Sequence, residues 1–300
     1  MFRIGVDLGG TKTEVAVIDS AGQTCFSKRE PTPRAYDSKI RLIATLVGQA
    51  REFTGSDSIP VGIGHPGSLN PATGLMRNAN STELNGHPLN TDIAAAIGQE
   101  VRCANDANCF ALSEAVDGAG ANADSVFGVI LGTGVGGGIV VNRQLIAGHG
   151  LLGGEWGHTG LPWAQKDEIP GPECKCGLHG CIETWLSGPA LTDDHLRRAS
   201  AFLSPSQIVA AAKEDHPGAI ATLDRFHDRL ARGLATVINI LDPEVIVLGG
   251  GLSNMPDIAA NVQQRLPKWV FSDQVTTRVV KNHHGDSSGV RGAAWLWPLE

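Results

Sequence analysis

Residues 4–19 read IGVDLGGTKTEVAVID, and residues 127–142 read FGVILGTGVGGGIVVN. The two stretches align without a gap and share glycines and apolar positions. Each predicts a strand, a glycine-rich turn and a second strand, because β-branched residues flank the glycines. Strand and helix patterns alternate after each copy, with helical spacing over 37–53 and 219–241 and a strand from Val61. The repetition predicts a duplicated α/β fold with two similar halves.

The composition is that of an ordinary globular chain. With 300 residues it can bury a full core and form two domains. The net charge of -7, without a dense lysine and arginine cluster, argues against nucleic acid or an anionic membrane as partner. The start, MFRIGVDLGG, lacks a basic region followed by an apolar one, so we expect no export, no membrane span and a cytoplasmic location. Cys25, Cys103 and Cys109 stand singly, and we expect them to be reduced and buried.

Three strand ends carry glycines whose amide groups could approach a polyphosphate. DLGGTK adds Asp7, Thr11 and Lys12, GTGVGGG adds Thr133, and EVIVLGGGLSN follows a long helical stretch. Neither of the first two is a Walker A loop or a Rossmann fingerprint, since a strand follows each. Taken singly, each hairpin could use its glycines only to satisfy a positive φ. Their repetition favours phosphate binding.

The motifs DLGGTK, NDAN, GTGVGGG, GEWGH and CKCGLHGCIE together resemble the bacterial ROK family of sugar kinases, repressors and related proteins. The resemblance spans the chain and implies the actin-like ATPase fold, in which two ribonuclease H-like domains form a cleft for ATP and a sugar. The expected domains are 1–117 and 118–287, with a helix over about 288–300 packing back onto the first. The residues that match the family's ATP-binding positions are Asp7, Gly10, Thr11, Lys12, Thr133, Gly134 and Gly250.

The stretch CANDANCFALSEA, residues 103–115, places polar side chains before a helical run over 109–116. Asp106 or Asn108 could simply be an N-cap, a position that both residue types favour. The resemblance implies instead that Asp106 is the catalytic base, which accepts the proton of the sugar 6-hydroxyl as that oxygen attacks. Asn105 would then bind neighbouring hydroxyls as both donor and acceptor.

Other residues match the sugar-binding side of the family. Glu155, His158 and Glu183 correspond to its sugar-contacting positions, and Gly67 and Asn80 resemble residues that line the sugar.

His65, within GHPGS, departs from the family, where an aliphatic residue is expected. A single histidine here is interpreted as a packing or surface residue rather than a catalytic one.

Three cysteines follow the spacing C-x-C-x4-C, with a histidine upstream. Three thiolates and one imidazole suit a closed, structural zinc site, whereas free thiols beside an unrelated histidine remain the alternative. A disulfide is less plausible than either in a reducing cytoplasm. The zinc-bearing members of the family match at His158, Cys174, Cys176 and Cys181, and His179 ranks below His158 as a ligand. Zinc would organise the segment whose flanks meet the sugar, while Mg2+ would accompany ATP.

The expected reaction is phosphorylation of a hexose by ATP. NANSTELNGHPL, GEWGH and HGDSSGVRGAAWLWP are more similar to fructokinases, so fructose comes first. NDANCFALSEA and VILGTGVGGG are equally similar to N-acetylglucosamine kinases, which are the alternative together with glucose or mannose kinases. A non-catalytic sugar sensor is a further alternative. A DNA-binding repressor would need an additional N-terminal domain, and the strand that begins at Arg3 leaves no room for one. Family members often pair, so we expect a homodimer.

Overall fold

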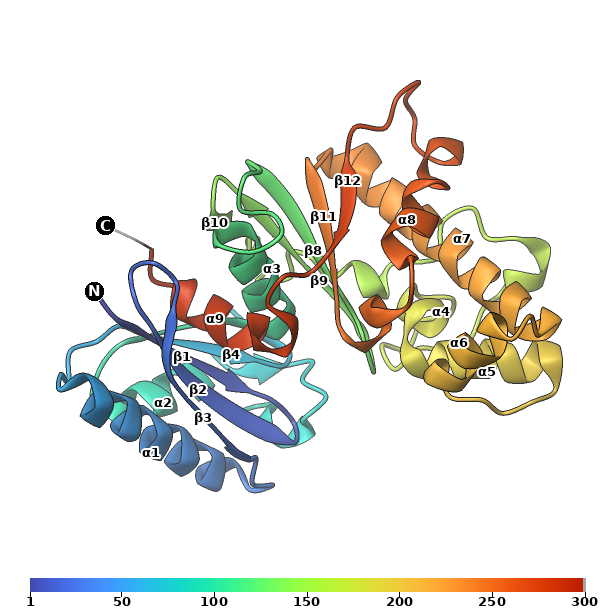
Figure 1. Ribbon diagram of the computed structural model, residues 1–300. Coiled ribbons are helices and arrows are strands. Elements are labelled where there is room, and N and C mark those ends of the chain that lie inside the picture. The colour runs from blue at the N-terminus through green and yellow to red at the C-terminus, as the bar shows by residue number, and fades with distance from the viewer. Residues whose placement is uncertain (299–300) are drawn as a thin grey trace. The chain divides into compact units, whose positions relative to one another are not determined.

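The computed structural model describes residues 1–298, and their contacts divide the chain into two compact units (Figure 1). The first unit contains residues 1–122, 138–154 and the segment from His284 onward. The second unit contains residues 123–137 and 155–283. The domain bounds expected from the sequence stay a prediction.

The first sheet has five strands in the order β3-β2-β1-β4-β7. Their bounds are β1 (Arg3–Leu8), β2 (Lys12–Ile18), β3 (Thr24–Pro31), β4 (Val61–His65) and β7 (Val101–Asn105). The predicted hairpin is present, since β1 pairs with β2 in antiparallel fashion. β1, β4 and β7 are parallel, with Asp7 opposite Gly64 and His65 opposite Asn105. These residues therefore lie at the carboxyl ends of parallel strands, the usual place for ligands in such sheets.

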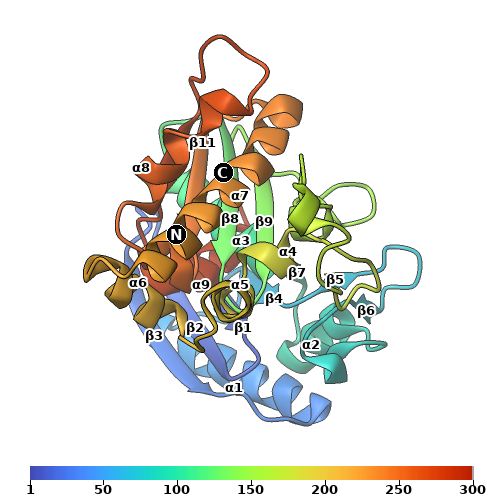
Figure 2. The same ribbon diagram turned by 90° about the vertical axis from the view of Figure 1, so that its right-hand side faces the viewer.

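Helices cover both faces of this sheet (Figures 1 and 2). They are α1 (Tyr36–Thr54) and α2 (Leu89–Ile97) on one face, and α3 (Asp106–Val116) and α9 (Ser288–Trp295) on the other. Two strand glycines allow α9 to approach closely. A Cβ at Gly5 would lie 2.0 Å from the Val290 carbonyl oxygen, and one at Gly62 would lie 1.8 Å from that of Ala293. Trp297, two residues after α9, contacts the same sheet, because its indole donates to the Val61 carbonyl at 2.8 Å.

Short elements follow β4 in the first unit: β5 (Ser68–Leu69), β6 (Met76–Arg77) and the 3-10 turn η1 (Thr82–Leu84). Lys39 of α1 is buried and pairs with Glu83 of η1 at 2.7 Å. Tyr36 of the same helix stacks on His87. Both contacts hold the loop that contains Asn80 against α1.

The second sheet also has five strands, in the order β10-β9-β8-β11-β12. Their bounds are β8 (Ser125–Leu131), β9 (Val135–Val141), β10 (Gln144–Leu145), β11 (Val245–Gly249) and β12 (Arg278–Lys281). β11 is parallel to both β8 and β12. Each sheet thus contains a hairpin with a glycine-rich turn and further strands that are parallel to the first strand of that hairpin. This confirms the duplicated α/β fold.

The second unit carries the remaining helices: α4 (Glu183–Leu186), α5 (Gly188–Ala199), α6 (Pro205–Lys213), α7 (Pro217–Leu241) and α8 (Ile258–Gln263). The longest is α7, whose buried face includes Phe226, Leu230, Leu234 and Ile238 at a spacing of four residues. The irregular stretch before α4 contains the 3-10 turns η2 (Trp156–His158) and η3 (Lys166–Glu168). Within residues 1–298, no helix combines the length and the apolar character that crossing a membrane requires.

Candidate functional site

The predicted catalytic base lies at the first residue of a helix. β7 ends at Asn105 and α3 begins at Asp106, three residues earlier than the run over 109–116 expected from the sequence. The N-cap is Asn105 rather than Asp106 or Asn108, since its Oδ1 accepts from the Ala107 amide at 2.9 Å. Its Nδ2 donates to the Gly67 carbonyl at 3.1 Å. The helix N-terminus favours a negative charge on the Asp106 carboxylate.

Asp7 lies close to this carboxylate within the first unit. Burial, together with the negative charges of Asp106 and Glu14, raises the pKa of Asp7 to about 7, although Arg29 acts in the opposite direction. A Cβ at Gly289 of α9 would lie 2.8 Å from Asp7 Oδ2, so only glycine leaves room for the carboxylate there. Two neighbouring acidic groups of this kind are suited to a bound divalent cation.

Gly67 and His65 are both fixed by their surroundings. Gly67 has φ 72°, and a Cβ there would lie 2.5 Å from the Arg77 carbonyl oxygen, so the chain requires glycine. His65 is a packing residue, because it is buried and its Nδ1 donates to the Pro66 carbonyl at 3.1 Å. Burial lowers the pKa of His65 to about 4, which keeps the ring neutral.

A cavity of about 260 Å³ adjoins Asn105 in the first unit. It is lined by His65, Ser68, Leu69, Arg102, Cys103, Ala104, Asn105, Asn108, Leu145, Ala147, Leu151 and Leu296. Its wall is therefore largely apolar, with a few polar groups at the strand ends. Sequence reasoning could not find it, because its lining comes from segments distant in the chain.

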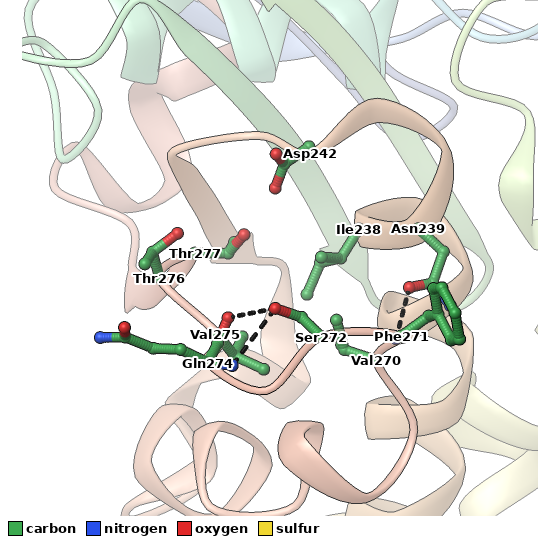
Figure 3. Close-up of a pocket in the computed structure, with 10 residues that line it drawn as sticks. All are labelled: Ile238, Asn239, Asp242, Val270, Phe271, Ser272, Gln274, Val275, Thr276 and Thr277. Atoms are coloured by element: carbon green, nitrogen blue, oxygen red, sulfur yellow. Dashed lines mark hydrogen bonds between the residues drawn. The ribbon is translucent and has the colours of Figure 1, made fainter.

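A larger cavity of about 450 Å³ in the second unit is not associated with the glycine-rich turns (Figure 3). It lies between the end of α7 and the loop before β12, and Ile238, Asp242 and Phe271 are among its lining residues. Asp242 precedes β11, whereas Gly250 follows it. This cavity is thus at the opposite end of β11 from the predicted phosphate-binding glycines.

We call residues 9–12 the first turn and residues 132–135 the second turn; they align in the repeat. The second turn is held by Glu183, whose Oε2 accepts from the Val135 amide at 2.9 Å. A Cβ at Gly134 would lie 2.5 Å from the same oxygen, which explains the glycine. The other oxygen, Oε1, pairs with Lys175 at 3.2 Å. Glu183 was expected to contact the sugar, and the sequence did not reveal that it also supports this turn.

Gly250 lies against the strand that leads into the second turn. It has φ 80°, and a Cβ there would lie 2.4 Å from the Leu131 carbonyl oxygen. Both the positive φ and the close approach require glycine at this position.

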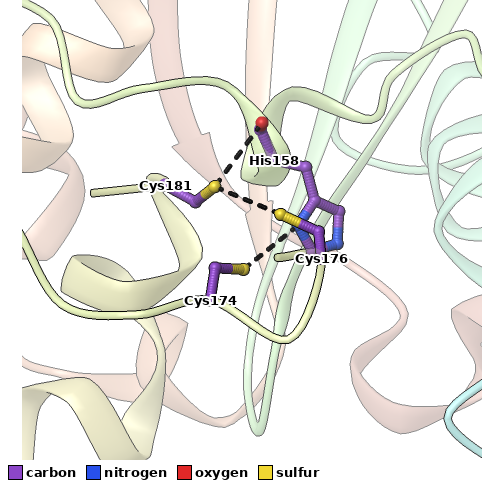
Figure 4. A group of neighbouring side chains, drawn as sticks. All are labelled: His158, Cys174, Cys176 and Cys181. Carbon is purple, nitrogen blue, oxygen red and sulfur yellow. Dashed lines mark hydrogen bonds between the residues drawn. The ribbon is translucent and has the colours of Figure 1, made fainter. Parts of the chain in front are cut away.

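Four predicted metal ligands meet in the second unit (Figure 4). The ligand atoms of His158, Cys174, Cys176 and Cys181 all lie within 4.8 Å of one another. The Cys176 and Cys181 sulfurs are 3.6 Å apart, and His158 Nδ1 is 3.5 Å from the Cys174 sulfur.

These spacings fit a tetrahedral zinc. Bonds of about 2.3 Å to sulfur and about 2.1 Å to nitrogen put two sulfurs about 3.8 Å apart and a sulfur and a nitrogen about 3.6 Å apart. A disulfide would need sulfurs at about 2.05 Å, so the thiols here are not bonded to one another. His179, the less favoured candidate ligand, is not among the four residues of the cluster.

The unpaired cysteines differ from one another. Cys109 is buried as expected, Cys103 is half-buried, and Cys25 is exposed, so the prediction of burial was wrong for Cys25. The residue lies on β3, where alternate side chains face solvent.

A buried ionic network fixes the irregular segment to α7. Glu168 of η3 accepts from Arg229 and Arg232 at 2.8 Å, and Arg229 also donates to Asp194 of α5 at 2.9 Å. Burial alone raises the pKa of Glu168, but hydrogen bonds from Arg232, the Gln165 amide and Arg229 lower it to about 2. The Arg229 guanidinium also lies 4.5 Å over the ring of Trp185 in α4. The network was not expected from the sequence, although two arginines three residues apart on a largely apolar helix were a signal for it.

Comparisons with known proteins agree with these features. The model of the ROK family matches residues 3–300. The N-acetyl-D-glucosamine kinase of Yersinia enterocolitica (serotype O:8 / biotype 1B) is 41% identical over 297 residues, covering 97% of this chain and 98% of the relative. A ROK hexokinase structure from Thermus thermophilus has a TM-score of 0.85 and 28% identity, and the match covers 98% of this chain and 97% of the hexokinase chain.

A further solved structure is that of a ROK family glucokinase from Streptomyces griseus in complex with glucose and AMPPNP. It has a TM-score of 0.80 and 28% identity, and the match covers 99% of both chains. The likeness to both structures confirms the actin-like fold that the sequence motifs implied.

Proposed function

This chain belongs to the ROK family, and on that premise we propose that it transfers the γ-phosphoryl group of ATP to the 6-hydroxyl of N-acetyl-D-glucosamine. The observation that carries the choice of sugar is the 41% identity, over 97% of the chain, to an N-acetyl-D-glucosamine kinase. The alternative from the sequence motifs therefore replaces fructose as the preferred substrate. Fructose was preferred on short motifs that the two kinds of kinase share in large part.

Asp106 is proposed as the general base. It accepts the proton of the 6-hydroxyl while that oxygen attacks the phosphorus, and it does so from the first residue of α3. Asn105 is held by its bonds to Ala107 and Gly67, so its amide has a defined orientation toward a neighbouring hydroxyl. Gly67 and Asn80 are proposed to complete the sugar contacts of the first unit.

The nucleotide contacts are proposed separately for each unit. In the first unit they are Asp7, Gly10, Thr11 and Lys12, and Asp7 would hold the Mg2+ that accompanies ATP. In the second unit they are Thr133, Gly134 and Gly250. The raised pKa of Asp7 supports a cation at this position, since a positive charge would favour its ionised form.

Zinc is proposed at the four-ligand cluster, where it would supply structural rigidity rather than reactivity because all four positions belong to the protein. His158 faces Cys174 through Nδ1, which leaves Nε2 to orient a sugar hydroxyl. Glu155 and Glu183, at the two ends of the same segment, are proposed as further sugar contacts. We also propose that the protein forms a homodimer. Light scattering during gel filtration would measure the mass of the assembly.

A coupled ADP-release assay with Mg-ATP tests the proposal. The panel is N-acetylglucosamine, N-acetylmannosamine, glucose, mannose and fructose, compared by kcat/KM. We expect the highest kcat/KM for N-acetylglucosamine. A higher kcat/KM for another sugar would overturn the proposed substrate but not the proposed kinase activity. Glucose is the main competitor, because the Streptomyces griseus glucokinase structure contains it.

Asp106→Asn separates a kinase from a sugar sensor. The variant should lose about a hundredfold to ten-thousandfold in kcat, the range that a general base contributes. Sugar binding, measured by calorimetry, should survive because the amide keeps the shape of the carboxylate. Sugar binding without turnover in the unaltered protein would favour the sensor.

A further inference from the structure

The second turn and Gly136, the residue that follows it, are supported from outside their own hairpin. Glu183 accepts from the Val135 amide, the Gly188 amide donates to the Gly132 carbonyl at 2.7 Å, and the Trp156 indole donates to the Gly136 carbonyl at 2.9 Å. Trp156 stands two residues before one metal ligand, and Glu183 two residues after another. Residues that flank the metal cluster therefore hold the turn from both sides.

Lys175 links the cluster itself to this support. It lies between two ligands, Cys174 and Cys176, and its Nζ is 3.2 Å from Glu183 Oε1. Its side chain is 49% exposed while that of Glu183 is only 14% exposed, so the lysine approaches the carboxylate from the solvent side. The two carboxylate oxygens thus join the cluster loop to the Val135 amide.

We infer that Lys175 is a positioning residue that couples metal binding to nucleotide affinity through Glu183. The inference rests on the proposed function, because it assumes that the second turn contacts ATP phosphates. With the metal bound, the loop around Cys174 and Cys176 is ordered and Lys175 orients Glu183. Glu183 in turn orients the Val135 amide, and with it the adjoining Thr133 and Gly134. When the metal or the lysine charge is lost, the carboxylate is free to rotate and the turn loses an ordered acceptor.

The affinity of the full chain for a non-hydrolysable ATP analogue with Mg2+ tests this without turnover. Calorimetry in the absence of sugar compares the unaltered protein with Lys175→Met, Lys175→Arg and the control Lys166→Met. Lys166 belongs to the same segment and is exposed. The metal content of each variant is measured by mass spectrometry.

Lys175→Met should keep its metal and bind the analogue about two- to fivefold more weakly, as expected for a partly exposed ion pair. Lys175→Arg should recover most of the affinity because it keeps the charge, and Lys166→Met should match the unaltered protein. Removal of the metal by a chelator should weaken binding more than Lys175→Met does, and adding zinc back should reverse the loss. In activity assays, Lys175→Met should raise KM for ATP more than KM for the sugar.

Unchanged nucleotide affinity in metal-loaded Lys175→Met would overturn the inference, as would a change confined to the sugar KM. Equal losses in Lys175→Met and Lys166→Met would also overturn it. If the unaltered, zinc-loaded protein did not bind the analogue at all, the proposed function itself would fail, and that result is distinct from the others.

Discussion

The first and second turns align residue by residue, yet the protein supports them differently. The first turn is held by the residue that follows β3 of its own sheet, since Thr32 donates through Oγ1 to the Gly9 carbonyl at 2.8 Å and through its amide to the Thr11 carbonyl at 2.9 Å. The second turn is held by Trp156, Glu183 and Gly188, which belong to the segment with the metal ligands and its continuation. A duplicated sequence motif therefore need not have a duplicated support.

The two copies also differ in charge. Asp7, which comes just before the first turn, aligns with Ile130, and Lys12 aligns with Val135. The first copy presents ionisable groups of its own. The second presents backbone amides, and the carboxylate that bonds to it, Glu183, comes from a distant segment.

The largest effect is expected when the metal cluster is broken. Cys181→Ala removes a buried ligand, so the protein should lose its metal and nearly all phosphoryl transfer. Amide hydrogen exchange should rise about tenfold or more at residues 132–137 and stay unchanged at residues 8–12, since only the second turn depends on this segment. Cys25→Ala, at an exposed cysteine of the first unit, is the control. Equal acceleration in both turns would contradict the comparison.

An intermediate effect on stability is expected at Asp7. Its pKa of about 7 lies above the usual 3.8, so the folded protein binds a proton there that the unfolded chain releases. Stability from this group is therefore complete below pH 4 and is lost as the pH rises to about 7. Asp7→Asn should remove this loss. It should stabilise the Mg2+-free protein by about 2 kcal/mol at pH 8 but hardly at pH 4. One pKa unit corresponds to about 1.4 kcal/mol, and solvent screening reduces the effect of the full pKa shift to this smaller value.

Denaturant unfolding of both proteins at several pH values measures this gain, and added Mg2+ should stabilise only the unaltered protein. Ile130→Val, at the aligned position of the second copy, is the control and should show no pH-dependent difference. A gain of equal size at pH 4 and pH 8 would show that the charge on Asp7 is not the cause.

The smallest effect is expected at Thr32. Thr32→Val removes the hydroxyl that donates to Gly9 but keeps the shape and the backbone amide bond to Thr11. The loss should be about 1.5 kcal/mol in the free energy of unfolding, because the same hydroxyl also bonds the Thr13 hydroxyl at 2.8 Å and two hydrogen bonds are lost. Hydrogen exchange should rise at residues 9–12 and not at 132–135, the reverse of the pattern for Cys181→Ala. Faster exchange at the second turn would mean that the two supports are not independent.

Much of the local structure could be predicted from the sequence. Helices expected over 37–53 and 219–241 are observed over 36–54 and 217–241, and both glycine-rich hairpins are present. Apolar periodicity and turn residues act over a few neighbours, so one stretch of sequence contains the information. The spacing of Cys174, Cys176 and Cys181 likewise indicated a cluster that the structure brings together.

A choice between neighbouring residues could not be made from the sequence alone. Asn105, not Asp106 or Asn108, caps α3, because the end of β7 determines where the helix starts. His65 could have been at the surface, and only the packing of the first unit shows that it is buried. Fructose and N-acetylglucosamine could not be separated by shared motifs, and similarity over the whole chain supports the second.

By itself, the sequence determined the alternation of strands and helices, the duplicated hairpins and the residue types available for a base and a metal. Only the tertiary structure decided which partners these residues have. Glu183 reaches Val135 across 48 positions of the chain, and Glu168 reaches Arg232 across 64. The physical reason is that a hydrogen bond or ion pair forms between groups that packing brings within about 3 Å, whatever their separation in sequence.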